Sequence, residues 1–175
     1  MLPISAALLG VSGKAMRYTL AIDPGAHTGL ALFEDENFLV ASTTDGSSFL
    51  SLRDAIADLI RPWPVMAHKV AVIEAGFLGV NRLTALVLER RRGFCQAASE
   101  LQGFACAELY PSTWQSKALK HLGDGKQGRP KRAELKRRAL EFARNIVGGP
   151  VASSDAADAI CMGWVYSRGL HLPGS

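Results

Sequence analysis

The alternation of apolar and polar positions divides the chain into a strand-rich first half and a helix-rich second half. Short apolar runs bounded by turn residues predict strands, and the first three, which are separated by tight turns, predict an antiparallel meander. The fourth run, VAVI, is fully apolar and mostly β-branched, which is typical of a central strand buried on both faces. The predicted strands cover residues 18–22, 30–33, 37–43, 70–73 and 105–110.

Apolar residues at three- and four-residue spacing predict helices, and most of them lie in the second half of the chain. Ser153 and Ser154 offer a cap to the last of these helices. Strands first, followed by strands and helices in alternation, predict one α/β domain over residues 16–170, with residues 1–15 as a loose extension. We expect a mixed five-stranded sheet, three antiparallel strands and then two parallel ones, flanked by helices. The predicted helices cover residues 51–60, 82–101, 113–122, 131–147 and 153–168.

The composition agrees with a folded domain. Of 175 residues, 48% are hydrophobic and 21% are charged, so the chain can bury a core and is not a disordered protein. The three cysteines, at positions 95, 106 and 161, form no CxxC pair, which indicates reduced thiols in a cytoplasmic protein. No apolar run approaches the length of a membrane-spanning helix, so we expect no membrane partner.

Charge is distributed unevenly along the chain. Residues 1–80 hold 5 Lys and Arg against 8 Asp and Glu, a balance of −3, whereas residues 111–145 hold 10 against 3, a balance of +7. Glycines interrupt this basic segment, and Trp114 lies within it. Such a segment favours a surface that contacts a polyanion, although a solvated helix face would have the same composition.

Four carboxylates stand in apolar surroundings. Asp23 follows the first predicted strand, Glu74 follows the buried strand, and Asp155 and Asp158 open the last predicted helix, one turn apart on the same face. Each has an ordinary structural alternative, such as a turn cap or a favourable charge at a helix N-terminus. Carboxylates that converge in an apolar setting repel one another unless cations neutralise them, and Mg²⁺ and Mn²⁺ prefer oxygen ligands. Two such ions about 4 Å apart activate water for phosphodiester hydrolysis.

The order of these motifs resembles that of RuvC-type Holliday-junction resolvases, possibly the phage type, within the ribonuclease H-like superfamily. AIDPGAHTGLALF is similar to their first strand-turn-strand, and VIEAGFLGVNRLTALVLERRRG is similar to their second motif. SSDAADAICMGW is similar to their closing Asp-x-x-Asp helix, and YPSTWQSKALKHLGDGK to a Lys-bearing stretch between the two. The resemblance covers roughly residues 17–168.

This resemblance implies that the four carboxylates bind two Mg²⁺ ions per active site, with Mn²⁺ able to substitute, and carry catalysis. It also implies that Phe77 stacks on DNA bases, although the residue is equally consistent with a core position. Asn81 and Arg82 match a segment that approaches DNA, and Asn81 is alternatively a helix cap. His27, beside Asp23, is expected to be a surface turn residue. Candidate phosphate contacts are Lys117, Lys120, Lys126, Arg129 and Lys131.

The resemblance implies a homodimer, formed through helix 82–101, because two symmetric active sites suit a four-way junction. Arg90, Arg91 and Arg92 lie either beside that interface or on a plain charged surface. The sequence therefore predicts a metal-dependent endonuclease that resolves Holliday junctions by symmetric nicks.

Alternatives are a nuclease of the same fold that acts on flaps, forks or RNA-containing duplexes, and a domain that binds nucleic acid without cutting it. The intact set of four acids argues against the second alternative. DPGxxTG loosely resembles the phosphate loop of actin-like ATPases, but 175 residues leave no room for their second nucleotide-binding half.

Overall fold

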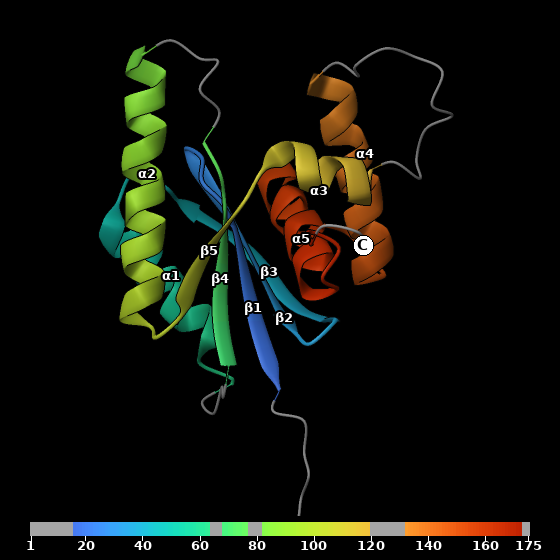
Figure 1. Ribbon diagram of the computed structural model, residues 1–175, viewed down its shortest axis with the longest axis horizontal. Helices are drawn as coiled ribbons and strands as arrows, with labels where there is room; N and C mark the ends of the chain where they lie inside the picture. Colours follow the sequence, from blue (N-terminus) through green and yellow to red (C-terminus); the bar gives the residue numbers. More distant parts are fainter. Residues whose placement is uncertain (1–15, 64–67, 77–81, 120–131, 173–175) are drawn as a thin grey trace, which may run out of the picture.

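The computed structural model describes residues 16–63, 68–76, 82–119 and 132–172. One five-stranded sheet forms its centre, with helices packed on both faces (Figure 1). The expected extension over residues 1–15 lies outside the described residues. The strands are β1 Arg17–Asp23, β2 His27–Glu34, β3 Asn37–Asp45, β4 His68–Glu74 and β5 Ala105–Leu109. The helices are α1 Phe49–Ile60, α2 Arg82–Leu101, α3 Pro111–Ala118, α4 Arg132–Val147 and α5 Ser154–Ser167.

The sheet has the order β3-β2-β1-β4-β5, and its topology is the one predicted. Strand β2 pairs antiparallel with both β1 and β3, whereas β4 pairs parallel with both β1 and β5. In parallel neighbours the carboxyl ends lie at the same edge of the sheet. The ends of β1 and β4 are therefore adjacent, and this adjacency positions the candidate site.

Alternate residues of the central strands supply two separate cores. Leu20 and Ile22 of β1 pack with α1 and α2, whereas Ala21 between them packs with α3, α4 and α5 on the opposite face. Helix α5 is the most deeply buried of the described helices, and its own alanines and Ile160 are among the side chains that it buries. The ring of Phe33 lies against Gly163, where a Cβ would come within 2.2 Å of the ring. Small residues thus let α5 lie directly on the sheet.

Helices α1 and α3 have boundaries that differ by two or more residues from those that the sequence predicted. Helix α1 begins at Phe49 rather than at residue 51, because the Ser48 hydroxyl accepts a hydrogen bond from the amide of Ser51 at 3.2 Å and caps the helix earlier. Helix α3 covers Pro111–Ala118 rather than 113–122. Proline is favourable at the first helical position, because its ring presets φ and the missing N–H has no partner there.

Helix α2 extends past the edge of the sheet in Figure 1. Near its C-terminal end Cys95 and Ala98 are buried against the sheet. Nearer its N-terminus, Thr84, Leu88 and Arg91 continue the same stripe but line a pocket instead. One face of one helix therefore serves both as core and as a pocket wall. In the described parts of the chain, no helix combines the length and the apolar character needed to cross a bilayer.

Candidate active site

Two of the predicted acids lie side by side at the carboxyl edge of the sheet. Asp23 is the last residue of β1 and Glu74 is the last residue of β4. The two strands are parallel, with Ile22 opposite Ile73, so the carboxylates that follow emerge from neighbouring positions. The rigid strands of the buried sheet hold the backbone of both residues.

The other two acids come from the first turns of α5. The Ser153 hydroxyl caps this helix by accepting a hydrogen bond from the amide of Ala156 at 3.0 Å. The carbonyl oxygen of Asp155 lies so close to β2 that a Cβ on Gly29 would come within 2.0 Å of it. Gly29, which pairs with Asp23 in the sheet, therefore permits the approach that brings Asp155 and Asp158 to the end of β1.

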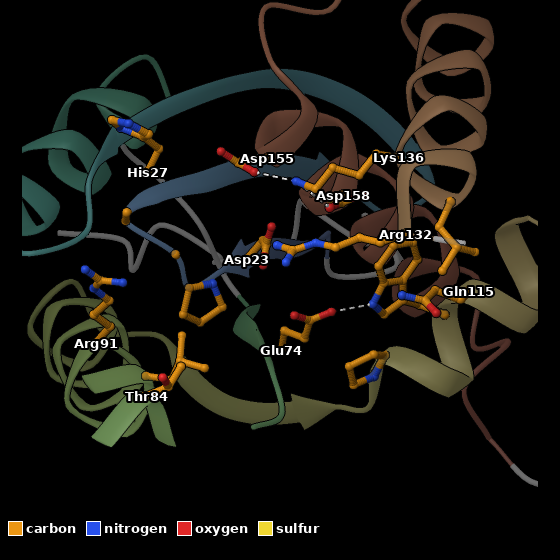
Figure 2. Close-up of a pocket in the computed structure, with 17 residues that line it drawn as sticks. Asp23, His27, Glu74, Thr84, Arg91, Gln115, Arg132, Lys136, Asp155 and Asp158 are labelled. Carbon is orange, nitrogen blue, oxygen red and sulfur yellow. Dashed lines mark hydrogen bonds and ion pairs between the residues drawn. The ribbon is translucent and has the colours of Figure 1, made fainter. Parts of the chain in front are cut away.

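Three carboxylates form one cluster, which Figure 2 shows. One oxygen from each of Asp23, Asp155 and Asp158 lies within 4.8 Å of the others. Among the described residues, this is the one group of three or more potential metal ligands that meets so closely. Glu74 lies beside the cluster, close enough to Asp23 for the charge of that residue to raise the pKa of Glu74. The structure thus brings together all four acids that the sequence singled out.

A lysine from α4 enters the cluster. The Nζ atom of Lys136 donates to Asp155 Oδ1 at 2.9 Å and to the Ser154 hydroxyl at 3.0 Å, and it lies 3.7 Å from Asp158 Oδ2. Burial acts to lower the pKa of Lys136, but the hydrogen bond to Asp155 and the attraction of Asp158 outweigh it and raise the pKa. Lys136 therefore stays protonated and serves as a built-in countercation.

The acids repel one another despite this countercation. Burial and the neighbouring Asp23 raise the pKa of Asp158 to about 7. Burial, and then the charge of Asp155, raise the pKa of Asp23, and burial together with Asp23 raises the pKa of Glu74. One positive side chain is thus insufficient for four carboxyls, and near neutral pH some of them hold protons.

Trp114 of α3 contacts Glu74 directly. Its indole Nε1 donates a hydrogen bond to Glu74 Oε1 at 2.8 Å, and the side chain is otherwise buried in the core beneath α3. This bond acts to lower the pKa of Glu74 and is outweighed by burial and by Asp23.

A pocket of about 600 Å³ opens above the acids. Its two walls carry positive charge, which comes from Arg91 of α2 on one side and from Arg132 and Lys136 of α4 on the other (Figure 2). Gln115 of α3 and His27 also line it. His27 is exposed at the start of β2, as expected for a residue of the turn.

The structure places only part of the predicted DNA-binding set. Arg82 is the exposed first residue of α2, and Lys117 is a half-buried residue in the last turn of α3. Neither belongs to the pocket lining. The remaining members lie outside the described residues; they are Phe77, Asn81, Lys120, Lys126, Arg129 and Lys131.

The sequence analysis did not identify Arg132 and Lys136 as residues of the site. It also did not identify the hydrogen bond from Trp114 to Glu74. The composition of residues 111–145 favours contact with a polyanion and leaves a solvated helix face as the alternative; in α4, Arg137 and Arg138 pair with Glu134 of the same helix. A signal was available for Lys136, which lies three residues before the buried Ala139 and therefore on the inward face of α4. No comparable signal linked Trp114 to Glu74, 40 residues earlier.

The residues present fit a hard divalent cation. Asp23, Asp155 and Asp158 offer carboxylate oxygens, which Mg²⁺ and Mn²⁺ prefer, and they include no soft ligand. Burial, and then the charge of Asp23, raise the pKa of Asp158, and a cation bound beside it would favour its charged form.

No protein-family model matches this chain, and no curated protein sequence matches it. The solved structures that are similar to it include two of RuvC. One is Thermus thermophilus RuvC, with a TM-score of 0.60 and 16% identity over 88% of this chain and 94% of that one. The other is T. thermophilus RuvC in complex with a Holliday junction substrate, with a TM-score of 0.62 and 15% identity over 89% of this chain and 94% of that one.

At 15–16% identity the likeness establishes the fold alone. For the fold, it confirms the resemblance to RuvC-type resolvases that the sequence motifs indicated. The chain therefore has the ribonuclease H-like fold of RuvC.

Proposed function

We propose that this protein is a metal-dependent endonuclease that resolves Holliday junctions by hydrolysing phosphodiesters. The observation that carries the proposal is the convergence of Asp23, Glu74, Asp155 and Asp158 beneath a pocket with cationic walls, in the fold of RuvC. A RuvC with this fold has been solved with a Holliday junction substrate.

Asp23, Asp155 and Asp158 would hold Mg²⁺ or Mn²⁺, with Glu74 completing the site. When bound, two such ions activate water and stabilise the leaving oxygen of a phosphodiester. The chain's own contribution is to gather these acids where the carboxyl ends of β1 and β4 meet the first turns of α5. We expect two ions per active site, a number that a calorimetric Mn²⁺ titration measures.

The pocket walls would hold the DNA backbone. Arg91 and Arg132 lie on opposite walls of the pocket. A guanidinium that lines a pocket is suited to a phosphate oxygen, which it binds in a charge-assisted hydrogen bond. Phe77, Asn81, Arg82 and the lysines named from the sequence stay predictions for further DNA contacts.

Helix α2 would form the dimer. Leu83, Leu86 and Val87 are 77%, 59% and 42% exposed, and their spacing places them on one face of the helix. That face differs from the one lined by Thr84, Leu88 and Arg91, so pairing would leave the pocket open. A two-fold pair of sites would suit symmetric nicks in a four-way junction.

Cleavage of synthetic DNA in Mg²⁺ or Mn²⁺ tests the proposal. A four-way junction, a flap, a fork, an RNA-containing duplex and a linear duplex are offered side by side, to the wild type and to Asp158→Asn. The proposal expects preferential cutting of the junction and loss of cutting in the variant.

Preference for flaps, forks or RNA would indicate another nuclease of this fold. Tight junction binding without any cutting would indicate a non-cleaving binding domain. Equal cutting by the wild type and Asp158→Asn would show that the four acids do not carry catalysis. Binding should also weaken steeply with salt, as phosphate contacts release counterions.

A further inference from the structure

The carboxyl group of Glu74 is held by a side chain from a different element. Trp114 is 2% exposed, and its Nε1 atom lies 2.8 Å from Glu74 Oε1. The chain path explains this proximity. Leu109, the last residue of β5, pairs with Glu74, and α3 begins two residues later at Pro111. Trp114 therefore lies in the first turn of a helix that starts beside the end of β4.

The chemistry of the indole makes this contact directional. An indole has one N–H donor and no acceptor, so it can bind a carboxylate oxygen but cannot compete for a cation. The bond from Trp114 reaches one oxygen of Glu74, and a dashed line marks it at the Glu74 carboxyl in Figure 2. Once Oε1 is committed to α3, rotation of the carboxyl group is restricted, and Oε2 is left for the interior of the site.

The main chain of the same residue is held from the opposite side. Arg92 of α2 donates from Nε to the carbonyl oxygen of Glu74 at 3.1 Å. Arg92 is itself fixed by ion pairs with Glu89 of α2, at 2.7 Å, and with Glu108 of β5. Glu74 is thus held at its backbone by α2 and at its carboxyl by α3. Of these two contacts, the indole bond is the one that acts on the direction of the carboxyl.

We propose that Trp114 is a positioning residue that orients Glu74 toward the metal-binding acids. The inference deepens the proposed function and rests on it, because it assigns to Glu74 a place in the metal site. Trp114 also packs in the core with Ala118 and Ile160, so it has a structural role in addition. The two roles separate experimentally, because the packing depends on the ring and the positioning depends on the N–H.

The test compares Trp114→Phe with Trp164→Phe. The first variant keeps an aromatic ring and removes the donor; the second changes a tryptophan that packs edge-on against Phe142 at 5.0 Å and does not line the pocket. Replacement of Trp114 by 3-benzothienylalanine, in which sulfur takes the place of the N–H in a ring system of the same shape, covers the case in which the phenylalanine variant does not fold.

Mn²⁺ binding, followed by calorimetry, is the first readout. We expect about 10-fold to 100-fold weaker binding without the donor, which is the usual effect of losing an outer partner of a metal ligand. Binding by Trp164→Phe should equal that of the wild type. In steady-state cleavage of the junction, kcat should fall while KM for DNA is unchanged.

The outcomes distinguish this inference from the proposed function. If folded protein without the donor binds Mn²⁺ as the wild type does, Trp114 is a packing residue only, whatever the DNA experiments show. If the donor strengthens Mn²⁺ binding but no DNA is cut, the positioning role stands and the nuclease proposal fails. If the wild type binds no Mn²⁺, both are overturned.

Discussion

The ammonium group of Lys136 lies 2.9 Å from Asp155 Oδ1 and 3.7 Å from Asp158 Oδ2, so a side chain from α4 neutralises part of the charge on α5. The side chain of Lys136 is 33% exposed and that of Asp158 is 15% exposed. The interaction is therefore stronger than a surface ion pair, although water still screens the lysine.

Lys136→Met should destabilise the metal-free protein, because it leaves the acids without their countercation. We expect a loss of about 1–2 kcal/mol in the free energy of unfolding, between the values typical of exposed and of buried pairs. Urea denaturation in EDTA measures it, and Mg²⁺ should restore part of the loss. Arg137→Met is the control, since its ion pairs lie on a 62% exposed side chain and should contribute little. Equal effects of the two substitutions would contradict this account.

Asp158→Asn should stabilise the metal-free protein at pH 8 while reducing DNA cleavage more than about 100-fold. The pKa of Asp158 is raised to about 7, so ionising it in the folded state costs free energy that the amide avoids. We expect a gain of about 1–3 kcal/mol in the metal-free state, since one pKa unit corresponds to about 1.4 kcal/mol.

The gain from Asp158→Asn should depend on pH. A carboxyl whose folded pKa is raised binds more protons folded than unfolded, so its contribution to stability is lost as pH rises from about 4 to about 7. The difference in stability between variant and wild type should therefore grow over this range in EDTA. A difference that is constant with pH would show that the carboxyl is not the cause.

Mg²⁺ binding should strengthen as pH rises from 5.5 to 8.5, because protons must leave the acids before a cation can bind. Burial raises the pKa of Glu74, Asp23 and Asp158, so the competition extends to neutral pH. Calorimetry in buffers of different ionisation enthalpy counts the protons released. No release at pH 6 would mean that these acids do not bind the ion.

Gly29→Ala should misplace the first turn of α5. The added Cβ would come within 2.0 Å of the Asp155 carbonyl oxygen, so the helix must move or the strand must bend. We expect a loss of about 1–3 kcal/mol in stability and weaker Mn²⁺ binding.

Gly93→Ala is the matched control for Gly29→Ala, because nothing lies within 4 Å of the Cβ that it would add and alanine favours a helix. It should be neutral or stabilising in thermal denaturation. If the two alanine variants behave alike, the close approach of β2 and α5 does not position the acids.

Leu86→Asp should convert the proposed dimer to a monomer, as measured by sedimentation velocity. Leu86 is 59% exposed on α2, and the control, Leu50→Asp, changes a residue of α1 that is 57% exposed. The two substitutions add the same charge at equal exposure, so only the proposed interface distinguishes them. A wild-type monomer, or a Leu86→Asp dimer, would reject the interface.

The sheet and the acid set could be predicted from sequence because both follow from short-range patterns. Asp23 and Glu74 each end an apolar run, and parallel pairing of those runs makes them neighbours. Asp155 and Asp158 share a face through helical periodicity. Each of these inferences needs only a few consecutive residues.

The partners of the acids could not be predicted in the same way. Lys136 reaches Asp155 from 19 residues away, and Trp114 reaches Glu74 from 40 residues away. Such contacts depend on how α3 and α4 pack over the sheet, which local periodicity does not specify. The helix charge was also misleading, because Arg138 forms an ion pair with Glu134 within α4 and leaves less free charge than the composition indicates.

The continuous stripe on α2 has a mechanical consequence. Thr84 and Leu88 line the pocket on the same face that Cys95 and Ala98 bury in the core, so the wall cannot rotate or slide without unpacking the sheet. The α2 wall of the pocket is therefore rigid and does not close over a ligand. If the protein cuts DNA as proposed, a stiff linear duplex must bend more to fit this wall than a strand that is already splayed at a branch point. The preference for branched DNA over linear duplex would then arise from the elasticity of the DNA.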